Sequence, residues 1–170
     1  MNKSNLKLIG VVGLALGAIF GASGSMIGGP VAQILLYQIS SLGLTVGCLT
    51  LGILFLRKNE DILCIGFLTL AIAEAVMSGG TANGQIGGQA SFGAGMALYA
   101  PALWLISSVS KWPLAPRITG LAASIPFIIA ATKIFMGEQV LSTSVLPSIA
   151  YPLLVLTIIG WIWSLIKEKI

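Results

Sequence analysis

The chain has 170 residues, of which 56% are hydrophobic and only 8% are charged, and its mean hydropathy is +1.01. Soluble domains carry about 25% charged residues, so this chain has too little polar surface to cover itself in water. The net charge of +4 does not indicate a nucleic-acid partner, because the basic residues stand singly or in pairs at the ends of apolar runs. The composition therefore predicts an all-α, polytopic membrane helix bundle whose main partner is the lipid bilayer.

Six apolar runs are long enough to cross a bilayer, and we expect them to form one membrane domain over residues 1–170. In chain order, the predicted transmembrane helices cover about residues 8–22, 31–56, 62–77, 92–109, 118–136 and 148–166. The segments between them are charged, polar, or rich in glycine and proline. The first run follows two lysines, Lys3 and Lys7, so it is also compatible with a cleaved signal peptide.

The distribution of positive charge predicts the orientation in the membrane. With six helices, both termini lie on the same side, and of the nine basic residues only Lys133 falls on the other side. The remaining eight are Lys3, Lys7, Arg57, Lys58, Lys111, Arg117, Lys167 and Lys169. Because cytoplasmic loops carry an excess of lysine and arginine, both termini are expected in the cytoplasm and the uncharged segment 78–91 outside. Three tryptophans, Trp112, Trp161 and Trp163, are then expected at the cytoplasmic interface.

The residue types that most enzymes depend on are missing or isolated. The sequence has no histidine, and its two cysteines, Cys48 and Cys64, form no CxxC motif. This excludes acid–base catalysis by histidine and the common zinc and redox motifs. We therefore expect a protein that is not an enzyme and that holds no cofactor.

Glu74 is the main candidate for a functional residue, because it is the only carboxylate inside a long apolar run. An ionisable residue at lipid depth is costly and by default marks a site or a partner. Lys133 lies at a similar depth, three residues or about 5 Å from the outer end of its predicted helix.

The polar residues in the outer halves of the other helices are Gln33, Tyr37, Gln38, Tyr99 and Tyr151. Together they predict an outward-facing polar vestibule whose wall holds an ion pair between Glu74 and Lys133. The alternative is that this pair is purely structural and only determines which helices are neighbours.

Methionines and glycines suggest two further interactions. Met26, Met77, Met96 and Met136 are all expected near the outer surface, where thioethers could form a soft site for Cu(I). Packing is the simpler role for methionine, so we expect no metal.

The small-residue ridges are formed by Gly13, Gly17 and Gly21 and by Gly43 and Gly47. Such ridges let helices approach closely in lipid, and they predict a possible homo- or hetero-oligomer.

Four segments carry a resemblance to known proteins: GFLTLAIAE at 66–74, SFGAG at 91–95, IFMGE at 134–138 and AYPLLVLTIIGWIW at 150–163. Over most of its length the chain resembles a group of small six-span bacterial inner-membrane proteins of unknown function. The resemblance implies a multi-pass protein of the bacterial inner membrane and no particular chemistry. The size and six spans are also similar to those of substrate-binding membrane subunits of vitamin importers, but none of their recognition residues is present.

Two functions from different classes follow from these features. The vestibule predicts small-solute transport or membrane solute binding. The glycine ridges are compatible with the alternative, a non-catalytic accessory or assembly subunit of a larger membrane complex. Ligand binding by the purified protein favours the first, and co-purification with a stoichiometric partner favours the second.

Overall fold

The computed structural model describes residues 2–27, 29–81 and 83–167. Within them the long helices are α1 (Lys3–Met26), α2 (Pro30–Leu56), α3 (Asp61–Thr81), α5 (Gln89–Ser108), α6 (Leu114–Phe135) and α7 (Val145–Lys167). A one-turn helix, α4 (Gly84–Gly87), joins α3 to α5. The 6 spanning candidates are between 20 and 27 residues long and apolar enough to cross a membrane. This confirms the predicted all-α fold with six transmembrane helices.

Several helices extend beyond the apolar runs that predicted them. Helix α3 continues to Thr81, although its apolar run ends near residue 77, and α6 begins at Leu114 within the segment predicted as a loop. Polar and small residues still form helical backbone hydrogen bonds, so a helix does not have to end where hydropathy falls. At the start of α1, the side chain of Asn2 accepts a hydrogen bond from the backbone N–H of Asn5 at 2.8 Å, which caps the helix.

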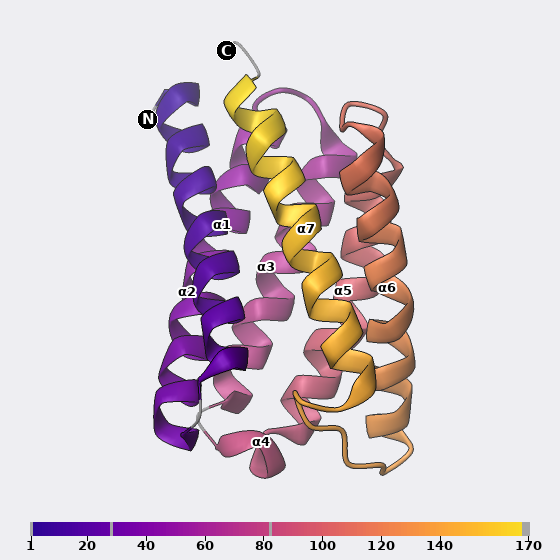
Figure 1. The fold of residues 1–170 in the computed structure, drawn as a ribbon. Helices are drawn as coiled ribbons and strands as arrows, with labels where there is room; N and C mark the ends of the chain where they lie inside the picture. The colour runs from indigo at the N-terminus through magenta and orange to yellow at the C-terminus, as the bar shows by residue number, and fades with distance from the viewer. Residues whose placement is uncertain (1, 28, 82, 168–170) are drawn as a thin grey trace.

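The long helices form a closed ring (Figure 1). In the described residues α1 packs on α2, α2 on α3, α3 on α5, α5 on α6, α6 on α7, and α7 returns to α1. Helix α1 begins and α7 ends at one end of the bundle, which we call the terminal end. Helix α4 lies at the opposite end, which we call the distal end. Because α5 stands between α3 and α6, residues on those two helices are not direct neighbours.

Helices α1 and α2 make a close backbone contact through the predicted glycine ridges. A Cβ atom added at Gly13 would lie 2.5 Å from the Cα of Gly47, and one added at Gly47 would lie 2.9 Å from the backbone N of Leu14. The Ser40 hydroxyl also donates a hydrogen bond to the carbonyl of Gly17 at 2.8 Å. The two ridges therefore pack on each other within one chain, and oligomer formation stays a prediction.

An aromatic cluster fills the ring at the terminal end. The rings of Phe55 and Phe67 stack with centroids 5.4 Å apart, and Trp161 meets Phe67 at 5.2 Å. Trp112 lies 6.0 Å from Phe55 and 6.3 Å from Trp161. Trp112 and Trp161 are buried inside the bundle, whereas Trp163 is exposed, and the place of the three at the cytoplasmic interface stays a prediction. Side chains from α2, α3, α7 and the loop between α5 and α6 thus meet inside the bundle at this end.

The terminal end also carries the charged loops. Lys111 forms an ion pair with Glu60 at 2.6 Å, and its Nζ lies 5.3 Å from the centre of the Phe55 ring. The guanidinium of Arg117 donates to the carbonyl of Ser107 at 3.0 Å. Lys169, one of the basic residues used for the orientation, lies outside the described residues. The cytoplasmic placement of this end stays a prediction.

Candidate functional site

A cavity of about 620 Å³ occupies the distal half of the ring. Its walls come from the second half of α1, the first half of α2, the last turns of α3, the first half of α5 and the first half of α7. The aromatic cluster at the terminal end lies beyond it and closes the ring on that side. The hollow is therefore confined to the distal half.

Glu74 is the buried charged residue of this cavity. Only 2% of Glu74 is exposed, and the hydroxyl of Tyr99 on α5 donates a hydrogen bond to its Oε1. The hydroxyl of Ser41 on α2 donates a second hydrogen bond to the same carboxyl group. The Tyr99 ring is held in place by Phe127, which stacks on it with the ring centroids 4.6 Å apart. Three helices thus position the carboxyl group through two hydroxyl donors.

The predicted ion pair between Glu74 and Lys133 is wrong. Lys133, in the last turn of α6, instead pairs with Glu138 at 2.7 Å, and both side chains are exposed. Gly137, with φ of +87°, turns the chain after α6 so that Glu138 comes back to Lys133. The sequence predicted a similar depth for the two candidates, but they lie on helices separated by α5, so a predicted depth could not pair them.

The other predicted lining residues divide between the cavity and its surroundings. Tyr37, Tyr99 and Tyr151 line the cavity. Gln33 lines a smaller pocket of about 60 Å³ next to it. Gln38 lies instead between α2 and α3, where its side chain donates to the carbonyl of Ser78 at 2.9 Å and accepts from the Ser78 hydroxyl at 2.6 Å.

Two serines of the polar wall were not among the predicted lining residues. Ser40 and Ser41 line the cavity together with Tyr37 and Leu44 of the same helix. These positions are spaced three, four and seven residues after Tyr37, which places them on one helical face. That spacing was available from the sequence and could have identified the serines as neighbours of Tyr37.

The smaller pocket connects the cavity to the distal end. It is lined by Gly80, Gly84 and Gly88 around α4, and it shares Tyr37, Met77, Phe92 and Ser142 with the cavity. The side-chain amide of Gln89 donates to the carbonyl of Val140 at 2.8 Å and accepts from its N–H at 3.2 Å. This pair of hydrogen bonds ties the start of α5 to the loop before α7.

The four methionines do not form one soft metal site. Met26 and Met136 are 86% and 77% exposed, at the ends of α1 and α6. Met77 and Met96 are buried on α3 and α5. Among the described residues there is also no group of three or more histidine, cysteine, aspartate or glutamate side chains that could hold a metal ion.

Six membrane-length helices closed into a ring define a multi-pass membrane protein, here with a buried carboxyl group at the wall of a cavity. Comparison of the chain with protein-family models, curated proteins and solved structures finds no match. The geometry of the cavity therefore carries the functional argument.

The bond from Tyr99 to Glu74 makes a testable contribution to stability. Replacing Tyr99 by phenylalanine removes the donor and leaves the rest of the ring, so we expect the free energy of unfolding to fall by about 0.6–1.7 kcal/mol, the range of side-chain hydrogen bonds in membrane helices. Tyr151→Phe is the matched control, because Tyr151 lines the same cavity without a hydrogen bond to Glu74. The measurement is thermal unfolding in detergent of Tyr99→Phe, Glu74→Gln and the double variant. This double-mutant cycle gives the coupling energy between the two side chains. Equal losses for the two tyrosine variants would contradict the assignment.

Proposed function

We propose that the protein binds a small solute in the cavity, as a transporter or as a solute-binding membrane protein. The observation that carries the proposal is a cavity of about 620 Å³ with the buried carboxyl group of Glu74 on its wall. Small-molecule sites typically measure about 300–1,000 Å³ and combine apolar walls with a few placed polar groups. This cavity has that size and that composition.

A purely structural role for the cavity is a poorer explanation. Protein interiors are close-packed, and voids larger than a water molecule are few. The terminal half of this ring follows that rule, because aromatic rings and leucines fill it. In the distal half, a buried ionisable group beside a large void lowers the stability of the protein. A ligand that occupies the void explains best why this arrangement is present.

The proposed orientation places the cavity on the outer side of a bacterial inner membrane. The described basic residues at the terminal end favour the cytoplasm for that end, since positive loops are retained there. The cavity then faces the outside, and the aromatic cluster separates it from the cytoplasm. Release of a solute to the cytoplasm then requires the cluster of Phe55, Phe67, Trp112 and Trp161 to open.

The test is a ligand screen on the purified protein. We expect at least one class of small solute to raise the melting temperature of the parent, and Glu74→Gln to abolish that rise. Glu138→Gln is the matched control, because Glu138 is an exposed carboxylate outside the cavity and is paired with Lys133. Absence of any ligand shift, combined with co-purification of a stoichiometric partner, would overturn the proposal in favour of the accessory-subunit alternative.

A further inference from the structure

We propose that the cavity takes an amphipathic organic cation, which enters sideways from the bilayer between α1 and α7. This inference rests on the proposed function and names the ligand class and its route. It is drawn from three features of the cavity: the sign of its charge, its aromatic wall, and its extension to the seam between the two helices.

The charge of the cavity favours a cation. Among the described lining residues Glu74 is the only charged side chain, and no lysine or arginine lies beside it. A carboxylate has two oxygens with about four acceptor positions, and Glu74 receives hydrogen bonds from Tyr99 and Ser41. Acceptor capacity therefore remains for a ligand. Anionic ligands would meet a buried carboxylate with no compensating positive charge, which is strongly unfavourable at low dielectric.

Four aromatic residues line the same cavity as Glu74. Tyr37, Phe92, Tyr99 and Tyr151 line the cavity from α2, α5 and α7. The face of an aromatic ring attracts a cation, with about 2 kcal/mol or more per contact when both are removed from water. Phe127 meets the Tyr151 ring edge-on at 5.3 Å and stacks on Tyr99, so the positions of these two rings are supported from behind. This arrangement suits an onium or ammonium group with an apolar body.

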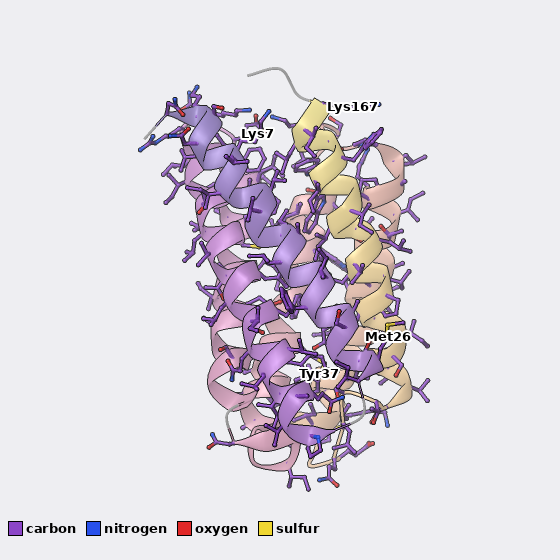
Figure 2. All side chains as sticks on the ribbon, turned by 60° about the vertical axis from the view of Figure 1, so that its left-hand side comes forward. Lys7, Met26, Tyr37 and Lys167 are labelled. Atoms are coloured by element: carbon purple, nitrogen blue, oxygen red, sulfur yellow. The ribbon has the colours of Figure 1, made fainter. Side chains whose placement is uncertain are left out.

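The wall formed by α1 and α7 is mainly apolar and reaches the surface of the bundle. It consists of small residues on α1, among them Ala18 and Ala22, and of aliphatic residues on α7, among them Val155 and Leu156. Leu156 is 55% exposed and also lines the cavity, so the hollow continues to the lipid-facing side of α7. In Figure 2, α1 lies in front with α7 beside it, and the labelled Tyr37 lies near the end of α1. An amphipathic ligand can thus keep its apolar body at the seam while its charge lies near Glu74.

The first test compares two probes of the same shape and opposite charge, tetraphenylphosphonium and tetraphenylborate, by titration of the purified full-length protein. We expect the cation to bind and the anion not to bind. Glu74→Gln should weaken binding of the cation by at least about 30-fold, as expected when one partner of a buried charge pair is removed. Glu138→Gln should leave it unchanged, because Glu138 lies outside the cavity. The comparison of the two probes uses the parent protein, so it stands even if Glu74→Gln does not fold.

The second test addresses the route. Ala22→Trp places a large ring in the seam between α1 and α7, and we expect it to slow association of tetraphenylphosphonium in lipid nanodiscs. Ile19→Trp is the matched control on the same helix, because Ile19 is 61% exposed and does not line the cavity. Equal association rates for the two variants, both with the melting temperature of the parent, would overturn the lateral route.

The outcomes separate this inference from the proposed function. Equal binding of the cation and the anion would overturn the charge assignment and leave solute binding intact. Binding of neither probe, together with a melting-temperature rise for another class of solute, would overturn the inference alone. The proposed function falls only if no solute of any class binds.

Discussion

Replacing Trp161 by alanine is expected to lower the free energy of unfolding by about 3–5 kcal/mol, as observed when a large buried aromatic residue is removed from a core. Trp161 is fully buried, and its ring contacts Phe67 and Trp112 at centroid distances of 5.2 Å and 6.3 Å. Its removal leaves a cavity at the centre of the terminal end, which neighbouring helices cannot fill without breaking the ring.

Trp163→Ala supplies the matched control two residues further along α7. Trp163 is 58% exposed, and its ring contacts Lys167, whose Nζ lies 4.3 Å from the ring centre. An exposed cation–π contact contributes about 0.5–1 kcal/mol, so the control should lose far less stability. The measurement is thermal unfolding with a thiol-reactive dye, since Cys48 and Cys64 are free and buried and become reactive on unfolding. Similar melting temperatures for the two variants would contradict the assignment of the aromatic cluster as the closed end of the ring.

Gly13→Ala is expected to lower the free energy of unfolding by about 3 kcal/mol, which is the upper end of the range for overpacked interiors. The added Cβ would lie 2.5 Å from the Cα of Gly47 and 2.7 Å from the carbonyl oxygen of Gly43. Backbone atoms cannot rotate away as a flexible side chain can, so α1 and α2 must move apart. The same displacement would open the α1 wall of the cavity and weaken ligand binding.

Gly79→Ala is the control, because it replaces a helical glycine that has no close neighbour. Gly79 lies in α3, and an added Cβ there has no neighbour within 4 Å. Alanine in an unhindered helix should stabilise by about 0.5–1 kcal/mol relative to glycine. The two variants should therefore shift the melting temperature in opposite directions. A stabilised Gly13→Ala variant would mean that the glycine ridges do not form the α1–α2 contact.

Much of the fold could be predicted because transmembrane helices are encoded by length and hydropathy alone. The predicted helix ends at residues 77 and 118 differ from those of α3 and α6 by four residues each, since α3 ends at Thr81 and α6 begins at Leu114. Hydropathy falls at the glycines and serines after residue 77, but backbone hydrogen bonding continues through them. Residues 78–91 were predicted as a polar loop, but the end of α3, helix α4 and the start of α5 lie within them.

The partners of the candidate residues could not be predicted in the same way. Successive residues of a helix are rotated by about 100°, so two residues at one depth can face opposite directions. Lys133 faces outwards and pairs with Glu138, whereas Glu74 faces the interior and accepts a hydrogen bond from Tyr99. Neither the rotation of α3 and α6 nor the position of α5 between them is visible in a hydropathy pattern.

By itself, the sequence determined that this is a multi-pass helical membrane protein and that Glu74 is the carboxylate inside a long apolar run. Those properties depend on composition along the chain, and the lipid environment enforces them. Only the tertiary structure decided that Glu74 is bonded to Tyr99, that the glycine ridges of α1 and α2 face each other, and that a cavity remains in the distal half. The physical reason is that these features depend on which helices are neighbours and how each is rotated, and packing across the whole ring determines both.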